Sequence, residues 1–202
     1  MRTIGLFGGT FDPVHSAHLD LAHAALAALA PDELRWVPAG HPWQKANELT
    51  PAEHREAMVR LAIDGEPRFV LERCELERTG PSYTVDTVRE LQARDTAPAR
   101  WFLLIGQDQH ARLHTWHGWQ DLLARVTLAV ARRPGPAPVV VPEVARFGHV
   151  AVPFAPHELS STEVRQRIAA GADISKLVPP EVARYIARHG LYGPPAGRQA
   201  RS

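Results

Sequence analysis

The chain has 202 residues, of which 45% are hydrophobic and 22% are charged, a composition typical of a globular protein with room for one core. Its formal net charge of +1 excludes a strong overall field toward DNA or an anionic membrane, and the single cysteine, Cys74, excludes an intrachain disulfide and a cysteine metal cluster. No apolar run approaches the roughly 18 residues of a membrane span. We therefore expect a cytoplasmic protein that binds neither nucleic acid nor membrane.

Short apolar runs alternate along the chain with segments that favour helix. Strands are predicted at residues 4–7, 34–37, 69–71, 101–105, 126–131 and 150–152, and helices at residues 18–30, 51–64, 85–93, 119–124, 160–170 and 179–190. Thr50 and Ser160, each followed by Glu three residues later, are predicted to open helices as capping boxes, and Thr84 is predicted to cap another. The proline-rich segment 134–142 is predicted to be a loop, and residues 193–202 a disordered tail.

The alternation predicts an α/β fold, with a doubly wound and mainly parallel sheet in a single domain over residues 1–192. Such sheets bind ligands beyond the carboxyl ends of their strands. Gly8-Gly9, Pro38, Gly106 and Arg132 all follow predicted strands. We therefore expect the binding site to form around them.

The first motif joins the first predicted strand to the first helix and reads Gly8-Gly9-Thr10-Phe11-Asp12-Pro13-Val14-His15-Ser16-Ala17-His18. Glycines let the backbone approach a ligand closely, and a helix start offers free N–H groups to an anion. His15 and His18 are three residues apart, so both can face the same phosphate. Two alternatives stay open for the histidines alone: an ordinary helix start with exposed side chains, or a zinc pair.

The second motif is Leu159-Ser160-Ser161-Thr162-Glu163-Val164-Arg165. Its hydroxyls, helix-start N–H groups and the Arg165 guanidinium would converge on an anion. Taken alone, it is more typical of a plain N-cap followed by a surface arginine.

Three middle segments carry further candidates. Thr84, after Pro-Ser-Tyr, opens a helix that can receive a carboxylate. Asp108 follows the most apolar strand and can accept hydrogen bonds from ribose hydroxyls. Trp116 can stack on a flat cationic ring, although packing against Trp119 is the alternative.

The two motifs resemble the signatures of the nucleotidyltransferase superfamily, which end in His-x-Gly-His and read Ile-Ser-Ser-Thr-x-x-Arg. Ala17 stands where the family usually has glycine, and we expect a helical conformation to accommodate it. Together with Pro-Ser-Tyr-Thr, Ile-Gly-Gln-Asp, the Thr-Trp pair and Arg132-Arg133-Pro134-Gly135, the chain resembles the nicotinate-nucleotide adenylyltransferases over residues 1–192. His117 stands where that family often has tyrosine.

The resemblance implies transfer of the adenylyl group of ATP to nicotinate mononucleotide, giving deamido-NAD and pyrophosphate. It implies that His15 and His18 are catalytic and that Mg²⁺ is carried mainly by the ATP phosphates; the sequence names no protein ligand to the ion. The implied acceptor residues are Thr84, Trp116 and His117. The implied ATP-binding residues are Gly8, Gly9, Thr10, Phe11, Lys45, Gly106, Asp108, Arg132, Ser160, Ser161, Thr162 and Arg165. The alternatives are another phosphorylated acceptor, including nicotinamide mononucleotide, and a non-catalytic nucleotide-binding protein.

Overall fold

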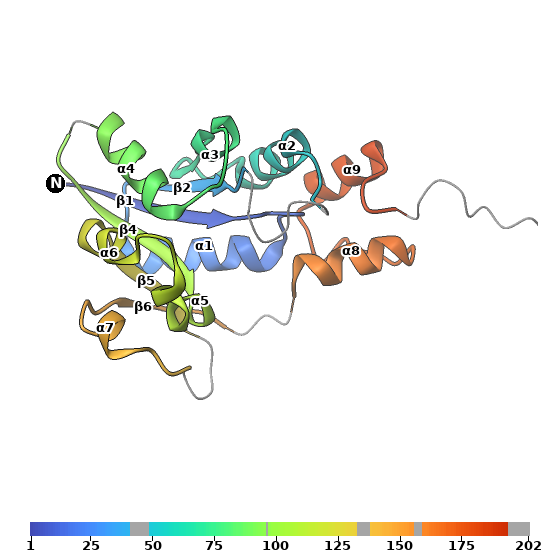
Figure 1. The fold of residues 1–202 in the computed structure, drawn as a ribbon. Coiled ribbons are helices and arrows are strands. Elements are labelled where there is room, and N and C mark those ends of the chain that lie inside the picture. The colour runs from blue at the N-terminus through green and yellow to red at the C-terminus, as the bar shows by residue number, and fades with distance from the viewer. Residues whose placement is uncertain (41–48, 96, 133–137, 156–158, 194–202) are drawn as a thin grey trace, which may run out of the picture.

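Six parallel strands form one sheet in the order β3-β2-β1-β4-β5-β6 (Figure 1). The computed structural model describes residues 1–40, 49–95, 97–132, 138–155 and 159–193. The strands are β1 (Arg2–Gly9), β2 (Glu33–Pro38), β3 (Phe69–Leu71), β4 (Ala99–Gly106), β5 (Thr127–Arg132) and β6 (Val150–Pro153). The predicted doubly wound sheet is confirmed, and every strand pair in it is parallel.

Helices cover both faces of this sheet. They are α1 (Ser16–Leu29), α2 (Ala52–Ile63), α3 (Cys74–Glu77), α4 (Thr84–Arg94), α5 (Gln107–Ala111), the 3-10 turn η1 (Leu113–Thr115), α6 (Trp119–Arg125), α7 (Pro142–Ala145), α8 (Ser161–Ala169) and α9 (Pro180–His189). Among the described residues, no helix has both the length and the apolar character needed to cross a membrane.

The strands are buried on both faces because their side chains alternate between two separate cores. On β4, Phe102 and Leu104 pack with α1, α2, α8 and α9, whereas Trp101, Leu103 and Ile105 pack with α3, α4, α6 and α7. A strand buried on both sides needs apolar residues at every position. This need explains the continuous apolar runs from which the strands were predicted.

The structure corrects several local predictions. Thr50 does not cap α2, whose N-cap is Pro51, and Thr84 is the first residue of α4 instead of its cap. Ser160 does cap α8, since its side chain accepts a hydrogen bond from the Glu163 amide. The short helices α3, α5 and α7 were not predicted, and α7 begins within the predicted loop at Pro142. Helices of four or five residues complete barely one turn, so they show no apolar period. Residues 194–202 of the predicted tail lie outside the described residues.

Candidate active site

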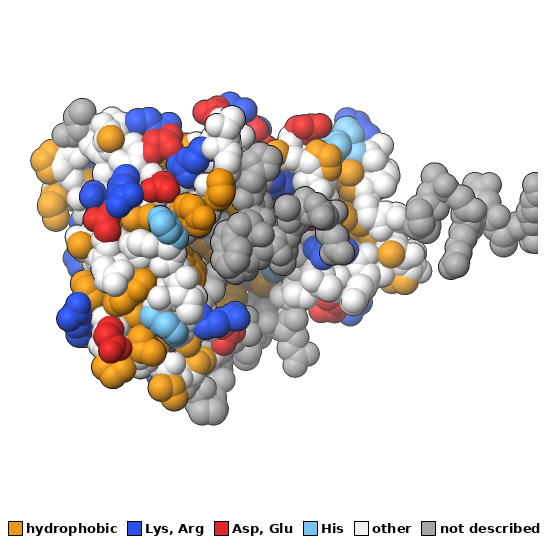
Figure 2. Space-filling view, viewed as in Figure 1, with side chains coloured by type: hydrophobic (Ala, Val, Ile, Leu, Met, Phe, Trp, Pro, Cys, Tyr) orange, Lys and Arg blue, Asp and Glu red, His pale blue; other side chains and the backbone are white. Residues whose placement is uncertain are grey.

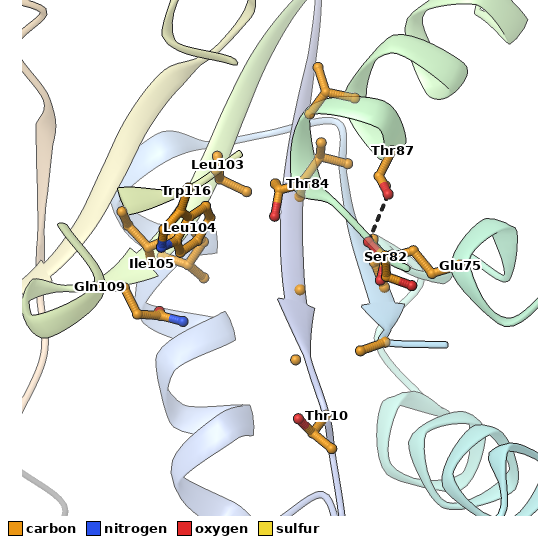
Figure 3. Close-up of a pocket in the computed structure, with 16 residues that line it drawn as sticks. Thr10, Glu75, Ser82, Thr84, Thr87, Leu103, Leu104, Ile105, Gln109 and Trp116 are labelled. Atoms are coloured by element: carbon orange, nitrogen blue, oxygen red, sulfur yellow. Dashed lines mark hydrogen bonds between the residues drawn. The ribbon is translucent and has the colours of Figure 1, made fainter. Parts of the chain in front are cut away.

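A pocket of about 180 Å³ opens at the ends of the neighbouring strands β1 and β4. The strand order reverses between these two strands, since β2 and β3 lie beyond β1 and β5 and β6 lie beyond β4. This switch in strand order is where doubly wound sheets bind ligands. Trp116 and Gln109 lie on one side of β1, Glu75 and Ser82 lie on the other, and Thr84 is seen over β1 between them (Figure 3). The lining residues are Leu6, Gly8, Gly9, Thr10, Val37, Ala39, Glu75, Ser82, Thr84, Thr87, Val88, Leu103, Leu104, Ile105, Gln109 and Trp116.

Gly8 and Gly9 serve different purposes at the end of β1. A Cβ on Gly8 would meet no protein atom within 4 Å, so the space beside it is open to a ligand. A Cβ on Gly9 would lie 2.8 Å from the Phe11 ring. Phe11 is 1% exposed and has a positive φ of 50°, so its ring is part of the core and only its backbone can reach a ligand. Gly9 is therefore needed for packing, and Gly8 leaves space for binding.

His15 and His18 lie together at the start of α1, with stacked rings whose centroids are 3.7 Å apart. The His15 amide donates to His18 Nδ1 at 3.2 Å, which leaves Nε2 to carry the proton of the neutral ring. Burial, and then the neighbouring His15, hold the pKa of His18 well below its usual value. His18 is therefore a neutral imidazole near pH 7 with a fixed N–H donor.

The second motif packs against the first. Ser161 Oγ donates to the Pro13 carbonyl at 3.0 Å, and Arg165 Nη1 donates to the Asp12 carbonyl at 2.7 Å. Thus the N-terminus of α8 adjoins the loop that leads into α1, as a shared phosphate site requires. Ala17 is buried within α1 and is not among the residues with positive φ, so its backbone has the helical conformation that we expected.

Trp116 lines the pocket, and Trp119 packs instead against Phe147, with ring centroids 6.5 Å apart. The indole of Trp116 is thus available to a ligand. His117 is exposed, and its ring lies 4.4 Å from that of Tyr83, which immediately precedes Thr84. Segments from two distant parts of the chain therefore meet at this end of the pocket.

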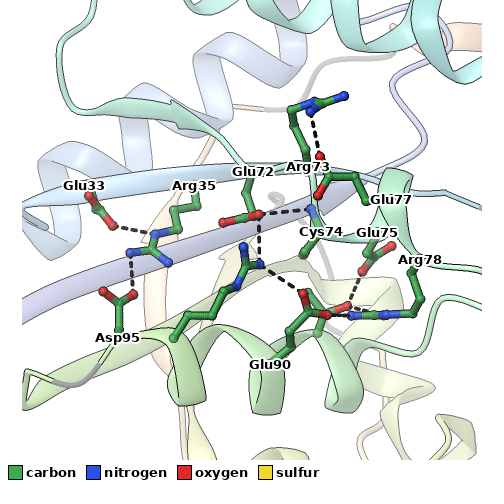
Figure 4. Close-up of polar contacts among 12 residues, drawn as sticks. Glu33, Arg35, Glu72, Arg73, Cys74, Glu75, Glu77, Arg78, Glu90 and Asp95 are labelled. Atoms are coloured by element: carbon green, nitrogen blue, oxygen red, sulfur yellow. Dashed lines mark hydrogen bonds and ion pairs between the residues drawn. The ribbon is translucent and has the colours of Figure 1, made fainter.

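Glu75 is a buried carboxyl group in the pocket lining that the sequence did not single out. Its Oε1 accepts a hydrogen bond of 2.7 Å from the Thr87 hydroxyl, which in turn accepts one from Arg78 (Figure 4). Burial is the main reason that the pKa of Glu75 is raised, and the contacts with Thr87 and Arg78 oppose this shift. The network ties α3 to α4 beside Thr84.

Three further predicted residues, Gly106, Asp108 and Arg132, are not in the pocket lining. Gly106 forms the N-cap of α5, where its amide donates to the Gln109 side chain. Asp108 and Arg132 are exposed, in the first turn of α5 and at the end of β5. Lys45 lies outside the described residues.

Sequence reasoning missed two residues at the base of the first motif. Arg55 is 2% exposed on α2, and Tyr192 bonds to Asp12 from beyond α9. Arg55 precedes the buried Met58 and Val59 by three and four residues. A charged residue on the apolar stripe of a helix was the available signal.

On the face that carries α4, basic and acidic side chains are interspersed (Figure 2). Arg89, for example, pairs with Asp86 and Asp121. Charge on this face is thus largely compensated locally, in keeping with the net charge of +1.

The fold and this site agree with the class of protein that a sequence comparison gives. Residues 6–167 match the Cytidylyltransferase-like family. A protein of Methylibium petroleiphilum described as a probable nicotinate-nucleotide adenylyltransferase is 52% identical over 202 residues, covering 97% of this chain and 95% of the relative. One from Bordetella petrii with the same description is 49% identical over 199 residues, covering 95% and 100%. The chain belongs to the nicotinate-nucleotide adenylyltransferase family.

A solved structure shows the same fold. The Plasmodium falciparum nicotinic acid mononucleotide adenylyltransferase, described in complexes with APC and with NaAD, superposes with a TM-score of 0.74 at 19% identity. The match covers 95% of this chain and 98% of that one.

Proposed function

We propose that this protein transfers the adenylyl group of ATP to nicotinate mononucleotide, producing deamido-NAD and pyrophosphate in the cytoplasm. The observation that carries the proposal is one pocket that joins Gly8 and Gly9 of the phosphate loop to Thr84 and Trp116 of the acceptor segments. These residues come from segments 75 to 108 positions apart, and the implied substrates need both sets.

The reaction is a single in-line displacement. A phosphate oxygen of the mononucleotide attacks the α-phosphorus of ATP, the new P–O bond forms, and the bond to the β-phosphate oxygen breaks to release pyrophosphate. Such chemistry depends on positioning and charge stabilisation, and it needs no protein nucleophile. We therefore assign no covalent intermediate.

His18 is the main catalytic donor in this proposal. Its neutral ring presents Nε2–H, because Nδ1 is occupied by the His15 amide. A hydrogen bond from Nε2 to the α-phosphate would strengthen as negative charge develops there. His15, stacked on His18, would contact the same phosphates.

Arg165 and Lys45 would hold the leaving pyrophosphate. Arg165 is fixed by the Asp12 carbonyl through Nη1, and its other N–H groups can face phosphate oxygens. The N-terminus of α8, with Ser160, Ser161 and Thr162, adds hydroxyl and amide donors. The ATP ribose and base would lie along Gly106, Asp108 and Arg132.

The nicotinate ring would stack on Trp116, and its carboxylate would accept hydrogen bonds from the amides of Thr84 and His117. An amide in place of the carboxylate can use only one oxygen as acceptor, so two N–H donors favour the acid.

Mg²⁺ would enter with the phosphates. Both carboxylate oxygens of Asp12 accept protein hydrogen bonds, from Tyr192 and from Thr50, so this buried group is not free to serve as a ligand. The N–H groups and hydroxyls around the loop suit hydrogen bonds to phosphate oxygens, and the phosphate oxygens themselves would hold the ion. When bound, Mg²⁺ supplies neutralisation of phosphate charge.

The direct test is to incubate the purified protein with ATP, Mg²⁺ and nicotinate mononucleotide and to quantify both products. Equal amounts of deamido-NAD and pyrophosphate are expected. Exchange of labelled pyrophosphate into ATP without acceptor should be absent, because no adenylyl-enzyme forms. A folded protein that binds ATP and makes no deamido-NAD would refute the proposal.

A further inference from the structure

A buried polar network lies directly beneath the loop that joins β1 to α1. At its centre, Arg55 donates from Nε to the Thr50 carbonyl at 3.0 Å, and from Nη1 to the carbonyls of Thr10 at 3.0 Å and Ala39 at 2.7 Å. Nη2 donates to the Gly40 carbonyl at 3.3 Å. One guanidinium thus ties the loops after β1 and β2 to the start of α2.

Asp12 extends this network upward into the loop itself. It is 2% exposed, and its carboxylate accepts hydrogen bonds from Tyr192 Oη at 2.5 Å and from the Thr50 amide at 3.2 Å. Its backbone carbonyl accepts the bond from Arg165. The residue three positions before His15 is thereby held from three separate segments.

Tyr192 reaches Asp12 because of how α9 ends. Gly190, with a φ of 59°, caps the helix in the left-handed conformation and turns the chain back. Leu191 then packs against the core shared by α1 and α2. Burial, and then the bond to Asp12, raise the pKa of Tyr192, so its hydroxyl stays a proton donor.

Stability alone is a weak reason for this arrangement. Burying a charged pair costs desolvation energy, and apolar side chains of similar volume often serve a core as well or better. Burial lowers the pKa of Arg55, and the charge of Asp12 opposes that shift. What the network does achieve is geometric, because two of the carbonyls it holds belong to Thr10 and Ala39 of the pocket lining.

We propose that Arg55 and Tyr192 are positioning residues for adenylyl transfer, which act through Asp12 and the Thr10 carbonyl to hold the loop that carries His15 and His18 in its reactive geometry. This inference rests on the proposed function for its kinetic consequence. Neither residue needs to touch substrate. Loss of a loop constraint should lower the rate of the chemical step more than the affinity for the acceptor, since Thr84 and Trp116 are placed by other elements, α4 and η1.

The sharpest variant is Tyr192→Phe, which removes one hydroxyl and keeps the ring. We expect kcat to fall about 10-fold, with KM for nicotinate mononucleotide within about twofold of the original value. Tyr185→Phe is the matched control, because its hydroxyl lies 2.9 Å from His54 Nδ1, away from the loop. It should leave kcat unchanged.

Arg55 is tested by a pair of substitutions. Arg55→Met removes charge and all four hydrogen bonds, whereas Arg55→Lys keeps the charge and one or two of the bonds. The Lys variant should recover part of the kcat lost in the Met variant. Melting temperatures of all variants, measured alongside, separate an unfolded protein from a folded one with a displaced loop.

A readout independent of turnover is the NMR signal of the His18 ring in protein labelled at histidine. Tyr192→Phe should shift this signal, and Tyr185→Phe should not. Unchanged kcat together with an unchanged His18 signal would overturn the inference, as would equal losses of kcat in the two tyrosine variants. If the unsubstituted protein makes no deamido-NAD, the proposed function fails, and the His18 signal still decides whether Tyr192 positions the loop.

Discussion

At the scale of single residues, the donor properties of His18 follow from one hydrogen bond and from the burial of its ring. The His15 amide occupies Nδ1, and burial keeps the ring neutral. A neutral imidazole with a fixed tautomer can meet developing phosphate charge without first losing a solvating water shell. Neither feature can be read from His-x-x-His, because the same spacing also fits an exposed pair.

Replacement of His18 tests this role. We expect His18→Ala to lower kcat by about 10²-fold or more, because a transition-state hydrogen bond is lost. Steady-state kinetics with both substrates measure the effect. His23→Ala, an exposed histidine on the same helix, is the control and should retain full kcat. A near-normal kcat for His18→Ala would assign the catalytic charge stabilisation elsewhere.

Trp116 contributes to binding in this account, and to chemistry only indirectly. Trp116→Ala should raise KM for nicotinate mononucleotide about 10-fold or more through loss of ring stacking, and Trp116→Phe should restore most of the affinity. KM for ATP should change little. An unchanged acceptor KM in the alanine variant would reduce Trp116 to a packing residue.

At the scale of elements, two adjacent glycines at the end of β1 differ in their surroundings, since Gly8 borders open space and Gly9 packs against Phe11. A methyl group on Gly8 would enter the pocket, so Gly8→Ala should keep the melting temperature and raise KM for substrate. The same change at Gly9 would press on the Phe11 ring, so Gly9→Ala should lower the melting temperature. Thermal melts and kinetics on this pair provide the comparison. Equal effects of the two changes on stability would contradict the assignment.

The junction of α3 and α4 predicts a pH dependence through Glu75. Its raised pKa means that the native state keeps a proton that the unfolded chain releases as pH rises above about 4.5. The contribution of Glu75 to the free energy of unfolding is therefore lost as the pH rises from about 4.5 through the higher pKa of the native state. Glu75→Gln cannot ionise, so it should raise the melting temperature at pH 7.5 and give no such gain at pH 4.5.

The matched control for this measurement is Glu77→Gln. Glu77 lies on the same short helix, but its side chain is 57% exposed and pairs with Arg73. We expect its effect on the melting temperature to be small at both pH values. Should Glu75→Gln be destabilising at pH 7.5, the carboxylate would have to be charged in the native state and stabilised by Arg78.

The elements also show where sequence reasoning succeeds and where it stops. Residues 101–105 are apolar throughout because both faces of β4 are buried, so the strand was predictable. By contrast, α5 spans only Gln107–Ala111, and its position depends on the Gly106 amide meeting Gln109. Arg55 lies on the apolar stripe of α2, which signals its burial, but its carbonyl partners depend on how two loops return over it and could not be predicted.

At the scale of the whole molecule, strand order brings distant motifs together. The two signatures lie about 150 residues apart, yet Arg165 contacts Asp12 directly. Their proximity was predictable from the family resemblance and from the rule for strand ends. The link from Tyr192 to Asp12 was not, because it depends on how the chain turns after α9.

At the opposite end of the sheet, ion pairs join the strands to the end of α4. There Arg35, on β2, pairs with Glu33 and with Asp95, both at 2.5 Å, and Arg2 joins the same carboxylates (Figure 4). These partly buried pairs hold the amino ends of β1 and β2 near the end of α4. The loops at the carboxyl ends of the strands, where the candidate site lies, are thus supported by a rigid sheet.

The most direct test of the central claim compares acceptors. Purified protein with ATP and Mg²⁺ should release pyrophosphate rapidly with nicotinate mononucleotide, at least about 10²-fold more slowly with nicotinamide mononucleotide, and not at all with phosphopantetheine. That result would support both the adenylyl transfer and a pocket that recognises the carboxylate through the amides of Thr84 and His117. Faster release with either of the other two acceptors would contradict the assignment of the acceptor pocket.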